Sequence, residues 1–352
     1  MPPRPFRLRS LGSALCALLL FPAAQAADAL VPADYDETFP ATQREIIAGA
    51  QPLSQAECEA KPHALWISAQ WIEKGTLSDS AKTGQACIRY FPSTQVGQTP
   101  DAPLIFIHGD RVEPEGFSDG TYRKQITFAN QIAKTISRAT VLIARPGVLG
   151  STGANHFTDR RTPQEAALIY AAIDALKARY AWSRLLLAGQ SGGGGLVAAM
   201  LTMGRDDIDC AAMSSGAVAV RLRTVDQQFR NPGRDSTGRY LYETYDPMDH
   251  VVRMTTDPAR RLFIVADRRD KRVSYNSQRQ FFLALERHGQ HALFIEQFAK
   301  DRNFHALTWP GVRAVGACAD GRSDDEIISL LSRNPLETAA REVLRSPAAA
   351  PI

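Results

Sequence analysis

A short glycine-rich segment around Ser191 carries the residue types that nucleophilic catalysis needs. Ser191 stands in the pattern Gly189-x-Ser191-x-Gly193, after an apolar run at residues 185–188 and before small residues at 194–200. A strand, a G-x-S-x-G turn and a helix in this order lift the serine hydroxyl off a sheet. They also place it at a helix N-terminus, where N–H groups and the helix dipole favour developing negative charge. We therefore expect Ser191 to be a nucleophile.

Other glycine-rich sites fit this segment less well. A phosphate-binding loop has the spacing of Gly189 and Gly194 but needs Lys and Ser or Thr next, whereas Gly195 and Leu196 follow here. The chain contains neither a dinucleotide-binding fingerprint nor H-E-x-x-H, so oxidoreductase and metallohydrolase activities have little support. We expect neither a cofactor nor a metal.

The order of apolar runs, glycine-flanked serine, acid and histidine over residues 104–309 resembles the α/β-hydrolase superfamily. The pair Gly193-Gly194 after the serine is similar to the prolyl-oligopeptidase and dienelactone-hydrolase branches. The resemblance implies a serine hydrolase whose triad follows the chain order Ser, acid, His. Both partners of Ser191 should then lie after it in the sequence.

His305 is the expected base, because a serine hydroxyl needs a histidine to accept its proton. It is the one histidine after the last apolar run, at residues 292–295. His288 and His291 flank a helix-to-strand turn and are expected to be surface or capping groups. The other candidates, His63 and His250, have the wrong chain order for the base.

Two carboxylates are candidates for the acid, since Asp267 and Asp270 both follow the apolar run at 261–266. Family members commonly have D-x-x-V in this loop, and Asp270 stands three residues before Val273. The resemblance therefore implies Asp270. Asp267 stays open as the alternative, or as a loop acid neutralised by one of its basic neighbours, Arg268, Arg269, Lys271 and Arg272.

The resemblance also implies an oxyanion hole made by the backbone N–H groups of Gly192 and Asp110. An acid at position 110 departs from the common pattern because a carboxylate would repel an oxyanion. Its side chain must turn away or form an ion pair, for which Arg111 is a candidate. His108, at the end of the run before Asp110, is expected to organise the loop. Gln190 and His156 are candidate pocket residues. The glycine-rich segment 145–156 is equally consistent with a plain connector.

Alternating apolar runs and helical stretches must position these residues. The runs are 104–107, 140–144, 184–188, 210–213, 261–266 and 292–295, and the helical stretches are 163–180, 194–203, 274–288 and 324–332. This alternation predicts an α/β fold with a doubly wound, mostly parallel sheet, which binds ligands at the carboxyl ends of its strands. Runs at 64–68 and 86–91 predict an antiparallel pair at the sheet edge. Residues 27–62 are interpreted as an arm, and 216–259 as a short cap-like insertion in a single domain 27–352.

The N-terminus is typical of a secretory signal peptide cut after Ala26. Three arginines precede an apolar run at 11–21 that is too short to span a bilayer, and small residues follow. Cleavage removes those arginines from 41 basic and 37 acidic residues, which leaves a net charge of +1. We expect a secreted or periplasmic protein without a membrane anchor, and near-neutrality disfavours nucleic acid as a partner.

Four cysteines remain after this cleavage, and an exported chain with an even count is expected to form disulfides. Three pairings are possible; the sequence order favours Cys58–Cys87 and Cys210–Cys318. No C-x-x-C spacing supports a zinc site.

Hydrolysis of a carboxylic ester through an acyl-enzyme is the leading functional hypothesis, with a small molecule or peptide as substrate. A serine peptidase or amidase of the prolyl-oligopeptidase type uses the same triad, and so does an acyltransferase. A catalytically inactive binding protein on this fold is the alternative from another class. Nothing in the sequence predicts the substrate or the oligomeric state.

Overall fold

A computed structural model describes residues 52–73, 79–98, 102–110, 117–153, 159–230 and 244–332. All of them belong to one compact unit, Thr38–Ile352. The predicted signal peptide lies outside the described residues. The predicted arm is described only from residue 52, and the predicted cap-like insertion only at 216–230 and 244–259.

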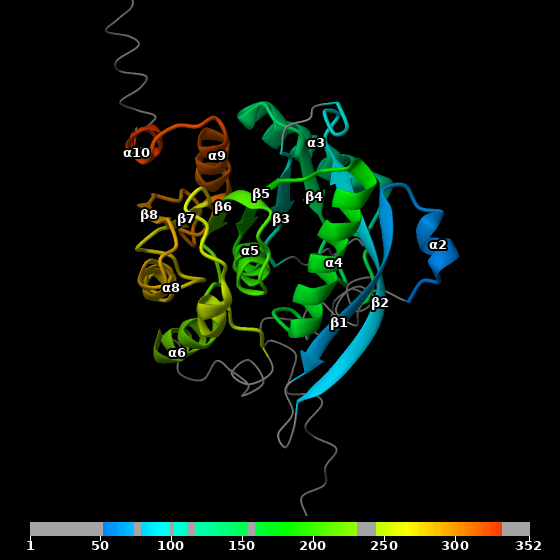
Figure 1. Cartoon of the computed structure of the whole chain (residues 1–352), viewed down its shortest axis with the longest axis horizontal. Coiled ribbons are helices and arrows are strands. Elements are labelled where there is room, and N and C mark those ends of the chain that lie inside the picture. Colours follow the sequence, from blue (N-terminus) through cyan, green and yellow to red (C-terminus); the bar gives the residue numbers. More distant parts are fainter. Residues whose placement is uncertain are drawn as a thin grey trace, which may run out of the picture. The chain divides into compact units, whose positions relative to one another are not determined.

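One eight-stranded sheet organises the described part of the chain, in the order β1-β2-β4-β3-β5-β6-β7-β8 (Figure 1). β2 is antiparallel to both β1 and β4, and every neighbouring pair from β4 to β8 is parallel. The strands are β1 (Ala64–Glu73), β2 (Ser80–Pro92), β3 (Leu104–Ile107), β4 (Thr140–Ile143), β5 (Leu185–Gln190), β6 (Ile208–Ser214), β7 (Arg261–Ala266) and β8 (Ala292–Glu296). The predicted mostly parallel sheet with an antiparallel edge pair is confirmed.

Helices cover both faces of this sheet, which explains why its central strands are apolar throughout. Side chains alternate between the faces along a strand. In β3, Ile105 and Ile107 pack in the core cluster that contains α4 (Pro163–Tyr180), α5 (Gly192–Thr202) and α8 (Tyr275–Arg287). Leu104 and Phe106 pack in the opposite cluster. That cluster contains α3 (Asp119–Ile136), α9 (Thr308–Ala319) and α10 (Asp324–Ser332).

The clearest local signals predicted the helices well. The helical stretch at 163–180 is confirmed as α4, where Thr162 caps the helix by accepting the Glu165 N–H and Pro163 occupies the first turn. The sequence reasoning missed α3 and α9. α9 begins with Thr308-Trp309-Pro310-Gly311, residues typical of a turn, but proline is tolerated in a first helical turn because its missing N–H has no partner there.

Three further helical elements complete the described structure. They are α2 (Gln55–Glu59), α6 (Val220–Arg230) and the 3-10 helix η2 (Pro247–Arg253). α6 and η2 both belong to the predicted cap-like insertion and are joined by Asp246. The Asp246 carboxylate accepts the N–H groups of Val220 (3.0 Å) and Arg221 (2.9 Å), and also that of Met248 (3.2 Å).

Two disulfides tie helices to the sheet, and both predicted pairings are confirmed. Cys58–Cys87 joins α2 to β2, and Cys210–Cys318 joins β6 to α9. Disulfides of this kind are consistent with an extracellular or periplasmic protein. None of the helices in the described ranges has the length and apolar character needed to cross a membrane.

Candidate active site

Ser191 occupies a strained turn between β5 and α5. Its backbone has φ 57° and ψ −119°, a conformation that costs a non-glycine residue about 1–3 kcal/mol. The Ser191 N–H donates to the Ser214 carbonyl (2.9 Å), and the Ser191 carbonyl accepts from Gly195 (3.1 Å) and Ala217 (3.0 Å). These bonds to β6 and α5 hold the turn in place. Ser191 therefore stands at the carboxyl end of the sheet, where the sequence predicted it.

The glycine at position 193 is required by close packing against β3. A Cβ atom there would overlap the carbonyl oxygens of Ile107 and His108 at the end of that strand. The start of α5 can approach β3 only because this side chain is missing. The glycines around Ser191 thus serve the tight strand-to-helix turn that the motif predicts.

Asp270 and His305 lie in contact, although 35 residues separate them in the sequence. The His305 Nδ1 atom is 2.8 Å from Asp270 Oδ2. The other Asp270 oxygen, Oδ1, accepts the N–H groups of Arg272 (2.7 Å) and Val273 (3.0 Å). The Asp270 side chain is fully buried. The loops after β7 and β8, which are neighbouring strands, thus bring the predicted acid and base together.

Asp267, the alternative acid, faces different partners. Its carboxylate accepts hydrogen bonds from Arg269 Nη2 (2.7 Å) and from the Ala299 N–H (2.8 Å). Burial acts to raise the pKa of Asp267, but the hydrogen bonds from Arg269 and Ala299 hold that pKa below its ordinary value. Asp267 therefore ties the β7 loop to the segment after β8. This arrangement agrees with the interpretation of Asp267 as a neutralised loop acid.

A second carboxylate, Asp301, shapes the loop that carries His305. It accepts the N–H groups of His305 (2.7 Å), Ala306 (2.8 Å) and Asn303 (3.1 Å). Burial acts to raise the pKa of Asp301, but these backbone donors hold it below its ordinary value. The sequence reasoning did not single out Asp301. The sequence feature that could have identified Asp301 is its position in a turn, where Asp side chains commonly accept hydrogen bonds from backbone N–H groups a few residues downstream.

Gln190 connects the histidine loop to the turn at Ser191. Its Nε2 atom donates to the His305 carbonyl at 3.1 Å. Among the described residues, no hydrogen bond joins the Ser191 hydroxyl to the His305 ring; free enzymes often show this contact long or poorly aligned. The role of Gln190 as a pocket residue stays a prediction. The second predicted pocket residue, His156, lies outside the described residues.

The remaining histidines have other partners. His291 lies 2.7 Å from an Asp324 carboxylate oxygen, and His288 is the exposed residue directly after α8. The His250 ring lies tilted against the Tyr245 ring, with 4.6 Å between centroids, and His63 contacts the Tyr122 hydroxyl at 2.6 Å. His108 Nδ1 is 2.6 Å from the Gly109 carbonyl, and its Nε2 accepts the Arg145 N–H at 3.3 Å. His108 therefore organises the loop after β3, as expected.

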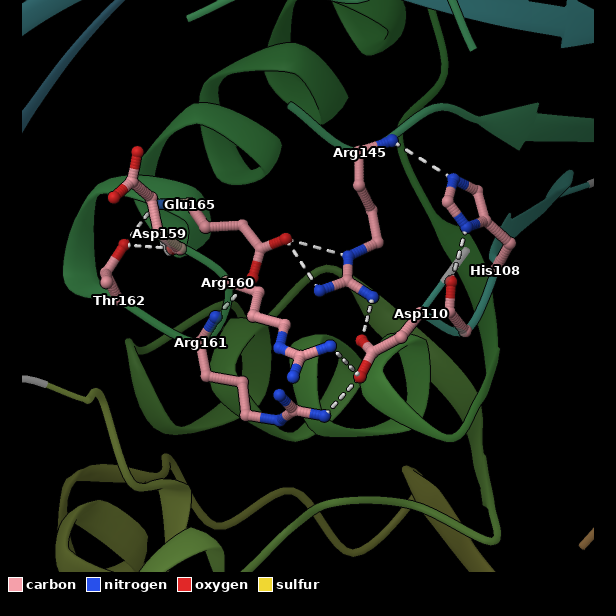
Figure 2. A network of polar contacts seen from close by, with 9 residues as sticks. His108, Asp110, Arg145, Asp159, Arg160, Arg161, Thr162 and Glu165 are labelled. Atoms are coloured by element: carbon pink, nitrogen blue, oxygen red, sulfur yellow. Dashed lines mark hydrogen bonds and ion pairs between the residues drawn. The ribbon is translucent and has the colours of Figure 1, made fainter. Parts of the chain in front are cut away.

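Gly192 lies just after β5 and Asp110 just after β3, and these two strands are parallel neighbours in the sheet. The Asp110 carboxylate is held by three guanidinium groups (Figure 2). It accepts from Arg145 Nη1 (2.8 Å), Arg160 Nη1 (3.2 Å) and Arg161 Nη2 (2.5 Å). The expectation of an ion pair is met, but by these arginines; the suggested partner Arg111 lies outside the described residues.

A small, mostly apolar pocket lies beside Gly192. Its lining includes Arg161 and Leu196, and also Val220, Tyr245 and Pro247 from the predicted cap-like insertion. This insertion therefore reaches the turn that carries Ser191. Its action as a cap stays a prediction.

Comparison with known families gives a match to part of the chain. Residues 155–303 match the model of the prolyl oligopeptidase family. The matched segment includes Ser191 and Asp270 and ends just before His305. The match agrees with the resemblance to α/β-hydrolases and supports a serine hydrolase. No curated protein matches the sequence.

Solved structures with a similar fold include esterases and peptidases. Est1E of Butyrivibrio proteoclasticus, solved with ferulic acid, is 18% identical over 72% of this chain and 96% of its own, with a TM-score of 0.46. An esterase of Pyrococcus furiosus is 11% identical over 81% of this chain and 96% of its own, with a TM-score of 0.46. The acylaminoacyl peptidase of Pyrococcus horikoshii is 14% identical over 69% of this chain, with a TM-score of 0.43; the similarity spans 38% of that longer protein.

Proposed function

We propose that this chain is an exported serine hydrolase that cleaves carboxylic esters through an acyl-enzyme. One observation carries the proposal: Ser191 is held in a strained turn at the same sheet end as the buried Asp270 and its partly buried partner His305. Strain of this kind persists where the surrounding structure over-determines it, and such sites cluster at active centres. The family match over residues 155–303 supports the same reaction class.

In the proposed reaction, Ser191 Oγ attacks the carbonyl carbon of the ester while His305 Nε2 accepts the hydroxyl proton. Asp270 Oδ2 accepts a hydrogen bond from His305 Nδ1–H, which selects the tautomer with a free Nε2 and stabilises the imidazolium that forms. The tetrahedral intermediate expels the alcohol, which takes the proton from His305. Water then attacks the acyl-enzyme with His305 again acting as base. The second tetrahedral intermediate breaks its bond to Ser191 Oγ, which takes the proton back from His305, and the carboxylic acid leaves.

The oxyanion of each tetrahedral intermediate would be bound by the N–H groups of Gly192 and Asp110. Gly192 is the first residue of α5, where the helix dipole also favours negative charge. A preorganised donor of this kind contributes about 3–4 kcal/mol of transition-state stabilisation. The charge on the Asp110 side chain does not oppose this role, because Arg145, Arg160 and Arg161 neutralise it.

A fluorophosphonate probe and a substrate panel test the proposal. We expect the probe to label Ser191 in the native enzyme, with the labelled peptide identified by mass spectrometry. A panel of p-nitrophenyl esters of rising acyl length, set beside aminoacyl anilides, should then show higher kcat/KM for the esters. Absence of labelling would support the inactive binding protein instead.

A serine peptidase of the prolyl-oligopeptidase type is the second candidate, because the family match favours it. It shares every residue of the proposed site, so the substrate panel separates the two. Higher kcat/KM for the anilides than for matched esters would contradict the esterase assignment and support the peptidase.

Export is the remaining part of the proposal. The basic, apolar and small residues of segment 1–26 and the two disulfides support it. Expressed with its natural N-terminus in a Gram-negative host, the protein should accumulate in the periplasm. Intact-mass analysis should show a chain that begins at Ala27 with all four remaining cysteines oxidised. A cytoplasmic protein that retains residues 1–26 would contradict export.

A further inference from the structure

An ion network surrounds the carboxylate of Asp110, whose N–H belongs to the proposed oxyanion hole (Figure 2). Arg145, at the end of β4, is its centre. The guanidinium donates through Nη1 to Asp110 (2.8 Å) and through Nε to Glu165 (2.7 Å). The Arg145 side chain is 0% exposed, and its contact with Glu165 is buried, whereas the Asp110 carboxylate is partly exposed.

Glu165 is itself fixed by the start of α4. Its Oε2 atom accepts the Arg161 N–H at 2.5 Å, and its own N–H donates to the capping hydroxyl of Thr162. A carboxylate near a helix N-terminus is stabilised by the helix dipole. Glu165 is therefore held at the start of α4, and Arg145 connects it to the loop after β3.

Arg145 stays charged in this position. Burial works against the charge, but Glu165 and Asp110 outweigh it and raise the pKa of Arg145 above its ordinary value. Removing either partner of a buried pair leaves an uncompensated charge, which is strongly unfavourable. The three residues therefore hold one another in a single arrangement.

The network touches the turn that carries Ser191. A Cβ atom added to Gly192 would overlap the Asp110 carboxylate and come within 2.6 Å of Arg145 Nη1. Both ion-paired groups thus pack directly against the residue that follows the nucleophile. The position of Asp110 relative to Gly192 is then set by Arg145 and by α4, and not by the short loop alone.

We propose that Arg145 is the positioning residue of the oxyanion hole. Through Asp110 and Glu165, it anchors the loop after β3 to α4, so that the Asp110 N–H is aimed at the developing oxyanion. This inference rests on the proposed function. Asp110 then has two roles. Its backbone N–H donates to the oxyanion, and its carboxylate holds that N–H in place by pairing with Arg145.

Arg145→Lys tests the proposal, because lysine keeps the charge but cannot reproduce the two-sided guanidinium contact. A displacement of about 1 Å in a catalytic group can lower turnover roughly 100-fold. We expect kcat to fall about 10- to 100-fold with KM within about twofold of the wild type. Affinity for a trifluoromethyl ketone, which forms an oxyanion on Ser191, should fall by the same factor.

Arg205→Lys is the matched control. Arg205 is equally buried and contacts Asp174 and Asp207, but it precedes β6 and lies at the other end of the sheet from Ser191. This variant should lose thermal stability while the folded fraction keeps the wild-type kcat. Equal kinetics of Arg145→Lys and Arg205→Lys would overturn the proposal and leave the proposed hydrolase intact.

Asp110→Asn keeps the test decisive if Arg145→Lys does not fold. A carboxylate that merely repels the oxyanion should give a faster enzyme when it is neutralised, whereas loss of an anchor should lower kcat about 10-fold. A faster variant would overturn the proposal. Absence of fluorophosphonate labelling in the wild type would contradict the proposed function, and with it this inference, whereas the variant kinetics test the inference alone.

Discussion

Ser191→Ala and His305→Ala are each expected to lower kcat by about a million-fold, because the members of a working triad act as a unit. Without the Ser191 hydroxyl no acyl-enzyme forms, and without His305 no group accepts the hydroxyl proton. Turnover of a p-nitrophenyl ester by each purified variant checks the expectation. The double variant should be no slower than either single variant.

Both variants should remain folded. The backbone at position 191 is held by bonds of its own N–H and carbonyl, which alanine retains. The histidine loop is held by the Asp301 carboxylate and Gln190, which contact only the backbone of His305. Circular dichroism spectra and thermal transitions should therefore stay close to those of the wild type.

Matched controls exist for both positions. Ser215 is a fully buried serine one residue beyond β6, and its hydroxyl has no hydrogen-bond partner among the described residues. His288 is an exposed histidine at the end of α8. Ser215→Ala and His288→Ala should keep the wild-type kcat. Near-normal turnover by Ser191→Ala or His305→Ala would contradict the triad.

Asp270→Asn is expected to lower kcat about ten-thousand-fold with little change in KM, because an amide favours the wrong tautomer of the histidine. The asparagine oxygen can still accept the N–H groups of Arg272 and Val273, which now bind Asp270. The loop should therefore keep its shape while the acid is lost. Steady-state kinetics and a thermal melt of the same preparation separate the two effects.

Asp267→Asn is the matched control for Asp270→Asn, because both carboxylates follow β7 and both are buried. Asp267 binds Arg269 and the Ala299 N–H, so its replacement should lower stability by about 1–3 kcal/mol. The kcat of the folded protein should stay near that of the wild type. A larger loss of kcat in Asp267→Asn than in Asp270→Asn would assign the acid to Asp267 instead.

Local sequence signals predicted the framework of this site. Continuous apolar runs predicted the parallel strands, because a sheet covered on both faces needs no polar positions. The helical stretch that begins at Pro163 predicted α4, and the glycine-flanked Ser191 predicted the turn after β5. α3 was missed although its buried positions have helical spacing, because polar residues dominate the rest of its surface.

Local sequence signals did not predict which side chains from distant segments contact one another. The loop after β7 contains two aspartates, and only the folded chain decides which of them contacts His305. The resemblance to D-x-x-V favoured Asp270, and the Val273 N–H supplies a physical basis by binding its carboxylate. The role of each residue in catalysis stays a prediction.

By itself, the sequence determined the fold class and the turn at Ser191, because both depend on patterns that are local in the chain. It favoured one of three possible disulfide pairings, which the structure confirms. Only the tertiary structure decided how Asp110 is neutralised. Arg145 reaches Asp110 because β3 and β4 are parallel neighbours, and Arg160 and Arg161, just before α4, reach the same carboxylate. The sequence around each of these arginines does not indicate a contact with Asp110. Ion pairing depends on the direction and burial of the side chains, and local sequence patterns do not predict either.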